Sequence, residues 1–387
     1  MTQRLCQIGF VLLIAFGRHV EQNESLTYKV TEIRPLAGTD HAVANAINDR
    51  GQVVGYCYQS GSPGHVLIPI PFVWEEGKMV TLRALGGQYG WATDINGRGD
   101  IVGFADKDVR TGLGISEYTA ESLPVMWVAW AEFQVDDWRD QVPLRLSEID
   151  AQELKINNRR QVIGCGRPKE GSSAATLRAW RAVEAKDKDG EVTGSMEAYT
   201  IPLPKHFVNS TFRPVDLNDN GEIIGNGGRI VANVGSRAIF ADGRGFLYKN
   251  GQWSELGSGT AKDSVNSECK ALNNRGAIVG WSTRAGKRQA TRWTDGVPES
   301  LPGSWGDISE ANAINDSGMI VGEAKSLKGE TRAWLWTATG ESDLNSKLPK
   351  KNGWILSGAT CINSKGQIVG GGVYKGNSNA TYLLTPK

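Results

Sequence analysis

The sequence predicts an all-β protein folded as a seven-bladed β-propeller, and three observations support this prediction. One short phrase occurs seven times: an aliphatic residue, Asn, a tight turn, two β-branched residues and Gly. Each copy begins a unit of roughly fifty residues with room for four strands, which is the size of one propeller blade. The last unit stops after three strands, while an extra strand precedes the first unit.

The repeated phrase predicts a tight β-hairpin at the start of every unit. Its Asn lies seven residues before its Gly in every copy, so insertions are confined to the connections. The two residues before that Gly are always β-branched, which favours a strand over a helix. Asn caps a tight turn through its side chain, and Gly within the turn adopts the positive φ that the hairpin requires. The repeated residues are Asn48, Asn96, Asn157, Asn218, Asn273, Asn315 and Asn363.

The third copy departs from this pattern at the end of its turn. It has Arg160 where the other copies have Gly. A residue with a side chain disfavours the left-handed backbone conformation. We therefore expect this turn to be strained or differently shaped.

An aromatic strand follows in each unit, and most units then have a turn and a short fourth strand. Residues 72–74 and 78–82 illustrate the two in the first unit. The seventh unit ends with a strand at 380–384, and residues 28–33 form a strand with no hairpin ahead of it. Pairing these two would remove both open sheet edges. We therefore predict that the N-terminal strand completes the last blade and closes the ring.

Residues 1–22 have the character of a secretory signal peptide. Arg4 precedes an apolar run from Ile8 to Gly17, which is too short to cross a bilayer. No later stretch approaches that length, so the sequence predicts a mature propeller over residues 27–387 without a transmembrane segment. We expect the protein to be secreted, in an extracellular or periplasmic location, and monomeric.

The charge balance excludes an electrostatic role toward polyanions. The chain has 43 Lys and Arg against 42 Asp and Glu, a net charge of +1. A nucleic-acid-binding protein usually carries a basic patch or a strongly basic composition. We expect no nucleic-acid partner.

Four cysteines remain outside the signal segment, which invites a disulfide framework in an exported protein. Cys57 and Cys269 fall at repeat positions that hold small residues in the other units, which indicates small buried fillers. Cys165 and Cys361 occupy variable positions in units three and seven. We favour free thiols, and Cys57 with Cys361 is the least implausible pair.

One segment imitates a calcium loop. Asp216 to Glu222 places oxygen side chains at alternate positions with Gly221 at the sixth, but the twelfth position is Gly227 rather than a bidentate acid. The same residues form the repeated hairpin turn. We interpret them as a structural turn and predict neither a metal site nor a cofactor.

Catalytic motifs are missing from the sequence. Histidines are scarce, and none lies in a recognisable nucleophile motif. Carboxylates are plentiful but unpaired by spacing, so a glycosidase pair could be assembled only in three dimensions. We predict no catalytic residues.

The repeated phrase followed by an aromatic strand resembles the extracellular repeats of the HAF family, from about Tyr28 to Pro386. The His-Ala-Phe triplet of that family corresponds here to sequences such as Arg332-Ala333-Trp334. The resemblance implies an exported repeat protein of uncharacterised molecular role, and it supplies no catalytic residues.

Three tryptophans stand at or near the beginning of first strands, namely Trp91, Trp305 and Trp354. Flat aromatic surfaces at a rim suit stacking against sugar rings or a hydrophobic partner side chain. The alternative is that they seal one blade against the next. Our leading hypothesis is an exported, non-catalytic binding module for a glycan or a surface protein. The alternative is a carbohydrate-active enzyme with carboxylates near the propeller channel.

Overall fold

The structure is a computed structural model of the 387-residue chain, and it describes most of the residues after position 25. The described residues are 26–60, 69–87, 89–107, 122–129, 143–146, 151–166, 176–186, 192–203, 212–228, 230–234, 237–240, 243–257, 266–301, 303, 308–326 and 328–387. The predicted signal peptide, residues 1–22, lies outside them.

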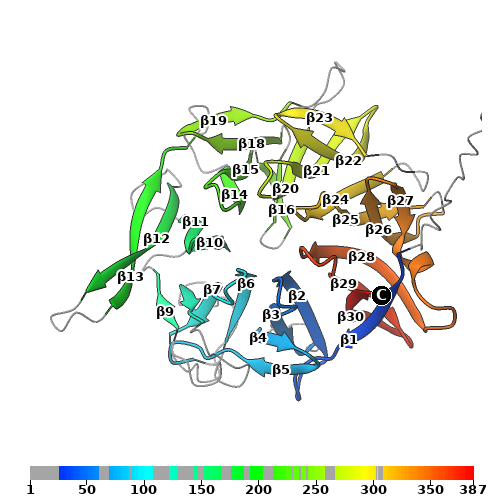
Figure 1. The fold of residues 1–387 in the computed structure, drawn as a ribbon, viewed down its shortest axis with the longest axis horizontal. Helices are drawn as coiled ribbons and strands as arrows, with labels where there is room; N and C mark the ends of the chain where they lie inside the picture. Colours follow the sequence, from blue (N-terminus) through cyan, green and yellow to red (C-terminus); the bar gives the residue numbers. More distant parts are fainter. Residues whose placement is uncertain are drawn as a thin grey trace, which may run out of the picture.

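Seven four-stranded antiparallel sheets form a ring, so the chain is an all-β, seven-bladed propeller as the repeats predict (Figure 1). Blades 1 to 3 consist of β2 (His41–Ile47), β3 (Val53–Tyr58), β4 (Ile70–Glu75) and β5 (Lys78–Thr81); β6 (Gly90–Ile95), β7 (Ile101–Asp106), β8 (Ser122–Trp127) and β9 (Leu144–Arg145); and β10 (Ala151–Ile156), β11 (Gln161–Gly166), β12 (Thr176–Lys186) and β13 (Val192–Ile201).

The next three blades follow the same order from the centre outward. They consist of β14 (Phe212–Leu217), β15 (Ile223–Gly227), β18 (Arg244–Lys249) and β19 (Gln252–Glu255); β20 (Ser267–Leu272), β21 (Ile278–Arg284), β22 (Lys287–Thr294) and β23 (Val297–Ser300); and β24 (Ile308–Ile314), β25 (Ile320–Lys325), β26 (Thr331–Thr337) and β27 (Gly340–Asp343). A separate hairpin of β16 (Ile230–Val234) and β17 (Arg237–Phe240) is inserted in blade 4, and a 3-10 turn, η3 (Leu344–Lys347), follows blade 6.

Blade 7 joins the two ends of the chain. It consists of β28 (Trp354–Ile362), β29 (Ile368–Tyr374), β30 (Asn377–Pro386) and β1 (Tyr28–Ile33). The register places Tyr28 opposite Pro386 and Ile33 opposite Thr381, and both Tyr28 and Ile33 are buried. The Thr381 hydroxyl also donates to the Ala42 carbonyl of blade 1 at 2.6 Å. The predicted closure by the N-terminal strand is therefore confirmed.

The core lies between neighbouring blades and is built around the third-strand aromatics. Trp127, Trp180, Trp293 and Trp334 are among the largest fully buried side chains. The indole of Trp127 donates to the Arg83 carbonyl at 2.8 Å, and that of Trp293 to the Gly257 carbonyl at 2.6 Å. Both carbonyls follow the fourth strand of the preceding blade, so these tryptophans fasten one blade to the next. In the described part of the chain no helix has the length and apolar character of a membrane span.

A β-bulge interrupts the first strand of every blade just before the repeated Asn. The pairing with the second strand skips one residue there, or two in blade 3, where Leu154 is buried in the core between blades 2 and 3. We call the residue three before each repeated Asn the bulge residue. The bulge residues are Asn45, Thr93, Leu154, Val215, Lys270, Asn312 and Thr360.

Candidate functional site

The hairpin turns at one end of the central channel are joined by the repeated asparagines, which we call the Asn ring. The Nδ2 atom of each Asn donates to the backbone carbonyl of the Asn in the next blade, over 2.9–3.1 Å. Asn363 donates to the carbonyl of Asn48, so the ring is complete across the closure. Each Oδ1 also accepts from the backbone amide four residues later in its own turn. The repeated Asn therefore caps its turn and links two blades.

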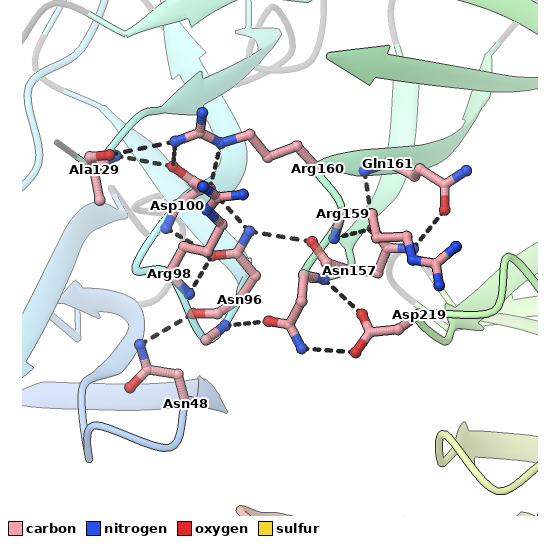
Figure 2. A network of polar contacts seen from close by, with 12 residues as sticks. Asn48, Asn96, Arg98, Asp100, Ala129, Asn157, Arg159, Arg160, Gln161 and Asp219 are labelled. Carbon is pink, nitrogen blue, oxygen red and sulfur yellow. Dashed lines mark hydrogen bonds and ion pairs between the residues drawn. The ribbon is translucent and has the colours of Figure 1, made fainter. Parts of the chain in front are cut away.

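The third turn keeps the shape of the others despite its arginine. Arg160 donates its backbone amide to the Asn157 carbonyl at 3.1 Å, as Gly99 does to Asn96 at 3.0 Å. The φ of Arg160 is 58°, so the strain that the sequence predicts is present and the change of shape is not. Figure 2 shows that its guanidinium reaches the buried Asp100 of blade 2 with two hydrogen bonds of 2.8 and 2.9 Å. We expect the ion pair with Asp100 to offset the cost of the strained backbone at Arg160.

The channel is narrow at the turn end. A cavity of about 190 Å³ lies there, lined by the aliphatic residue, the Asn and the following residue of all seven turns. Ligand pockets usually measure about 300–1,000 Å³, so this cavity is smaller than a typical ligand pocket. Within the described residues no group of three His, Cys, Asp or Glu side chains could hold a metal ion. The segment resembling a calcium loop, 216–222, forms the hairpin turn of blade 4.

The opposite end of the channel opens into a much larger cavity of about 830 Å³. All seven bulge residues line it, so every blade contributes to its wall. The rest of the wall, on blades 3 to 6, is mostly charged or polar. These further lining residues are Glu153, Lys155, Pro214, Asn226, Glu268, Cys269, Arg288, Glu310 and Glu323. We call this space the channel cavity.

A compact ion cluster occupies the side of the channel cavity formed by blades 5 and 6. Glu310 accepts hydrogen bonds from Lys270 on one oxygen and from Arg288 on the other. Burial acts to raise the pKa of Glu310, but the two cations outweigh it and the pKa is lowered. The Arg288 guanidinium also lies 4.1 Å from the centroid of the Trp281 ring. Glu310 is thus held as a carboxylate and is not suited to donate a proton.

A second ion cluster crosses blades 2 to 4 deeper in the channel. Burial acts to lower the pKa of Lys155, yet Asp94 and Asp216 together raise it, so the lysine stays charged. Burial outweighs Lys155 at Asp216 and raises the pKa of that carboxyl to about 6. Both Asp216 oxygens accept backbone amides, from Leu217 and from Leu272 of the next blade, at 2.9 Å. Asp216 therefore joins blade 4 to blade 5.

The three tryptophans predicted to bind ligand do not form one platform in the described residues. Trp91, in β6, is half-buried, stacks on Phe104 at 4.9 Å and packs against the core between blades 2 and 3. Trp354 is 9% exposed, begins β28 and stacks on Tyr374 at 4.5 Å in a different core cluster. Trp305 lies outside the described residues. These contacts of Trp91 and Trp354 correspond to the alternative that the tryptophans pack one blade against the next. A role of the three tryptophans in ligand binding stays a prediction.

The four cysteines in the described residues are free. Cys57 and Cys269 are fully buried, as their small-residue positions predict. Burial raises the pKa of the Cys57 and Cys361 thiols to about 11, so both are poor nucleophiles.

Comparisons with known proteins bear on the fold. No family model and no curated protein matches the sequence. Among solved structures, an acylaminoacyl peptidase of Pyrococcus horikoshii matches with a TM-score of 0.50 and 10% identity, over 88% of this chain and 51% of that one. The chain thus spans about half the length of the peptidase chain. Similarity is weaker to TolB from Acinetobacter baumannii, with a TM-score of 0.41, 8% identity and coverage of 87% and 63%.

A lectin from Aleuria aurantia, solved in complex with a fucosylated sugar, matches with a TM-score of 0.31 and 10% identity, over 82% of this chain and 94% of the lectin. Identities this low concern the architecture and not the chemistry of a site. The match to the peptidase concerns the fold alone, and the comparisons assign the chain to no family.

Proposed function

We propose that the protein is an exported, non-catalytic binding module, and that its ligand is a glycan bound in the channel cavity. The observation that carries this proposal is the cavity itself, which measures about 830 Å³ and is lined by all seven blades. That volume lies well within the range of about 300–1,000 Å³ typical of ligand pockets. The resemblance of the repeats to the HAF family and the signal-like residues 1–22 support the exported location.

The chemistry of the cavity wall suits a polyhydroxylated ligand. Asn45, Thr93, Asn312 and Thr360 bring amide and hydroxyl groups from blades 1, 2, 6 and 7, while Val215 adds apolar surface on blade 4. A sugar ring needs both, because its hydroxyls donate and accept while its C–H faces pack on apolar surface. The charged groups of blades 5 and 6 already pair with one another, so they offer strong hydrogen bonds without requiring a charged ligand.

A surface protein is the other ligand class that the repeats suggest, and the concave cavity favours a glycan over it. An extended protein interface is usually broad and only shallowly curved, whereas pockets for small ligands are concave. Binding to a protein alone is therefore an outcome that would count against the proposal.

The carboxylates in and around the cavity favour binding over hydrolysis. A glycosidase needs a carboxylic acid with a raised pKa that can protonate the leaving oxygen, beside a second carboxylate at a fixed separation. Burial raises the pKa of Glu153, which lines the cavity, and of Asp216, which is buried behind its wall, and this speaks for the alternative of a carbohydrate-active enzyme. However, Glu153 pairs with Arg213 at 3.3 Å, and both Asp216 oxygens accept backbone amides. Glu310 is clamped between two cations.

A glycan array of residues 23–387 tests this proposal. We expect the unmodified protein to bind a restricted set of glycans, and Glu310→Gln to weaken that binding at least tenfold because the ion cluster in the wall is broken. The matched control is Glu299→Gln, which breaks the exposed Arg292–Glu299 pair on the outer strands of blade 5 and should leave binding unchanged. Melting curves of all three proteins verify the fold. An empty array for the folded protein would contradict the proposal.

A further inference from the structure

Blade 7 lacks a pair of side chains that the other blades have above the bulge. In every blade the residue five before the repeated Asn lies directly opposite the residue eight after it, on the second strand. In six blades both positions carry side chains: Val43–Tyr56, Trp91–Phe104, Gln152–Cys165, Arg213–Asn226, Glu268–Trp281 and Glu310–Glu323. In blade 7 the pair is Gly358–Gly371.

The backbone does not require glycine at this pair. A Cβ at Gly371 would meet no atom within 4 Å, and its φ is not in the left-handed region. The flanking Gly370 and Gly372 differ, because a Cβ there would lie 2.1 and 2.3 Å from backbone oxygens of β28. A Cβ at Gly358 would approach only the Glu323 Oε2 atom at 3.0 Å, the end of a flexible side chain. The two glycines therefore leave space that the fold could have filled.

The space is a cavity of about 380 Å³ where blade 7 meets blade 1. We call it the glycine pocket. Its lining includes His41, Tyr58, Glu323, Ser357 and Thr360, together with the backbone of residues 370–372. Glu323 and Thr360 also line the channel cavity, so the two cavities adjoin. The glycine pocket is a side chamber of the proposed binding site.

One wall of the glycine pocket is aromatic and positioned by its neighbours. The His41 and Tyr58 rings lie 4.8 Å apart, and the two residues are opposite each other in the register of β2 and β3. The His41 Nε2 atom lies 3.6 Å from the Asp40 carboxylate, which itself accepts hydrogen bonds from Ser60. A preordered ring surface beside hydroxyl and carboxylate groups is the arrangement that recognises one sugar ring.

We propose that the glycine pocket is a subsite for a single neutral sugar ring of the glycan whose remainder occupies the channel cavity. This inference rests on the proposed function. The His41 and Tyr58 rings face the C–H surface of the sugar, and Glu323 accepts hydrogen bonds from its hydroxyls. The Glu323 carboxylate disfavours an acidic sugar by repulsion. The junction of blades 7 and 1, which closes the propeller, thus also determines which glycan terminus is bound.

The decisive variant is Gly371→Phe, which fills the pocket as Phe104 fills the equivalent position in blade 2. Its melting temperature should not fall, since the site has room and replacing a strand glycine reduces the entropy lost on folding. We expect at least a tenfold loss of affinity for the neutral glycan that binds the unmodified protein best on the array. The matched control is Gly303→Phe, another glycine with open space and ordinary φ, which should bind as the unmodified protein does.

The outcomes separate this inference from the proposed function. If Gly371→Phe binds the same glycan with unchanged affinity, the subsite is wrong and glycan binding in the channel stands. If the unmodified protein binds only acidic glycans, the subsite for a neutral sugar is wrong and glycan binding stands. If it binds no glycan at all, both proposals are wrong. Should Gly371→Phe fail to fold, Tyr58→Ala tests the opposite wall, and unchanged affinity in that variant would overturn the subsite.

Discussion

The two ends of the propeller channel are built from the same seven strands in opposite ways. At the turn end every blade presents the same Asn, and seven equivalent hydrogen bonds of 2.9–3.1 Å leave a cavity of only about 190 Å³. At the other end the bulge residues differ from blade to blade and surround about 830 Å³. The repeated residues therefore form the structural frame of this molecule, and we propose that the residues that vary between blades form the surface offered to a ligand.

The contrast has a physical cause. Each bond of the Asn ring is a second hydrogen bond to a carbonyl of the next blade, and each Asn Oδ1 accepts a backbone amide of its own turn, so a missing Asn breaks the link between blades and leaves that amide unpaired. The bulge residues also link neighbouring blades, but different side chains form these links in different blades. Asn45 donates to the Ala92 carbonyl at 2.7 Å, Thr93 to the Leu154 carbonyl at 2.8 Å, and Lys270 to the Asn312 side chain at 2.8 Å. Because several residue types can make these links, the bulge positions can vary without loss of the fold.

The largest effect on stability is expected from Asn218→Ala at the turn end. The change removes donors to Glu222 and to the Asn273 carbonyl and acceptors for two backbone amides, so we expect a loss of about 3 kcal/mol in the free energy of unfolding. Denaturant unfolding measures it. The control is Asn220→Ala in the same turn, which loses one exposed hydrogen bond to the Asn274 carbonyl and should cost under about 1 kcal/mol. If both variants lost the same free energy of unfolding, the Asn ring would not be more important for stability than the other turn residues.

Arg160→Gly should also destabilise the turn end, by about 2 kcal/mol, although it restores the residue of the other copies. Glycine relieves the left-handed backbone at φ 58°, but the buried Asp100 then loses its bidentate partner. The same substitution in an Asp100→Asn background should instead be neutral or stabilising, because no buried charge is left unpaired. A double-mutant cycle by denaturant unfolding provides both values. If Arg160→Gly alone stabilises the protein, the ion pair is not what compensates the strain.

Asp216→Asn should change how the stability of the protein depends on pH. Burial raises the folded pKa to about 6 from an ordinary value of 3.8, so the folded state binds this proton more tightly than the unfolded chain does. Its contribution to stability is therefore fully present below about pH 4 and is lost as the pH rises to about 6. The melting temperature of the variant relative to the unmodified protein should increase across that interval and then level off. A flat or decreasing difference in a pH series of melting curves would contradict this assignment.

The smallest effect on stability is expected from Thr360→Val at the cavity end. The side chain is exposed to the channel and makes one hydrogen bond of 3.2 Å to the Val369 carbonyl, so the free energy of unfolding should change by under about 0.5 kcal/mol. Because Thr360 lines both the channel cavity and the glycine pocket, glycan affinity should nevertheless fall severalfold. Isothermal calorimetry with the best array ligand measures the loss, and a stable variant with full affinity would weaken the assignment of this end to binding.

The frame could be predicted from the sequence because it is repeated. The constant Asn-to-Gly spacing, the β-branched pairs and the unpaired strand 28–33 give the seven blades and their closure. The hydrogen bond from each repeated Asn to the next blade could not be predicted, because the role of Asn in capping its own turn is enough to explain why Asn recurs there. The channel cavity could not be predicted either, since its wall depends on a bulge that shifts the strand register. One signal was available: Gly358 and Gly371 stand where every other unit has side chains.

Hydrogen–deuterium exchange with and without the best array glycan tests the difference between the two ends most directly. The account predicts that the glycan slows exchange in the bulge segments, such as residues 43–45, 268–270 and 357–360, and in 370–372. The turns of the Asn ring, such as 48–52 and 218–222, should exchange as in the free protein. Protection confined to the turns would contradict the assignment of binding to the opposite end of the channel.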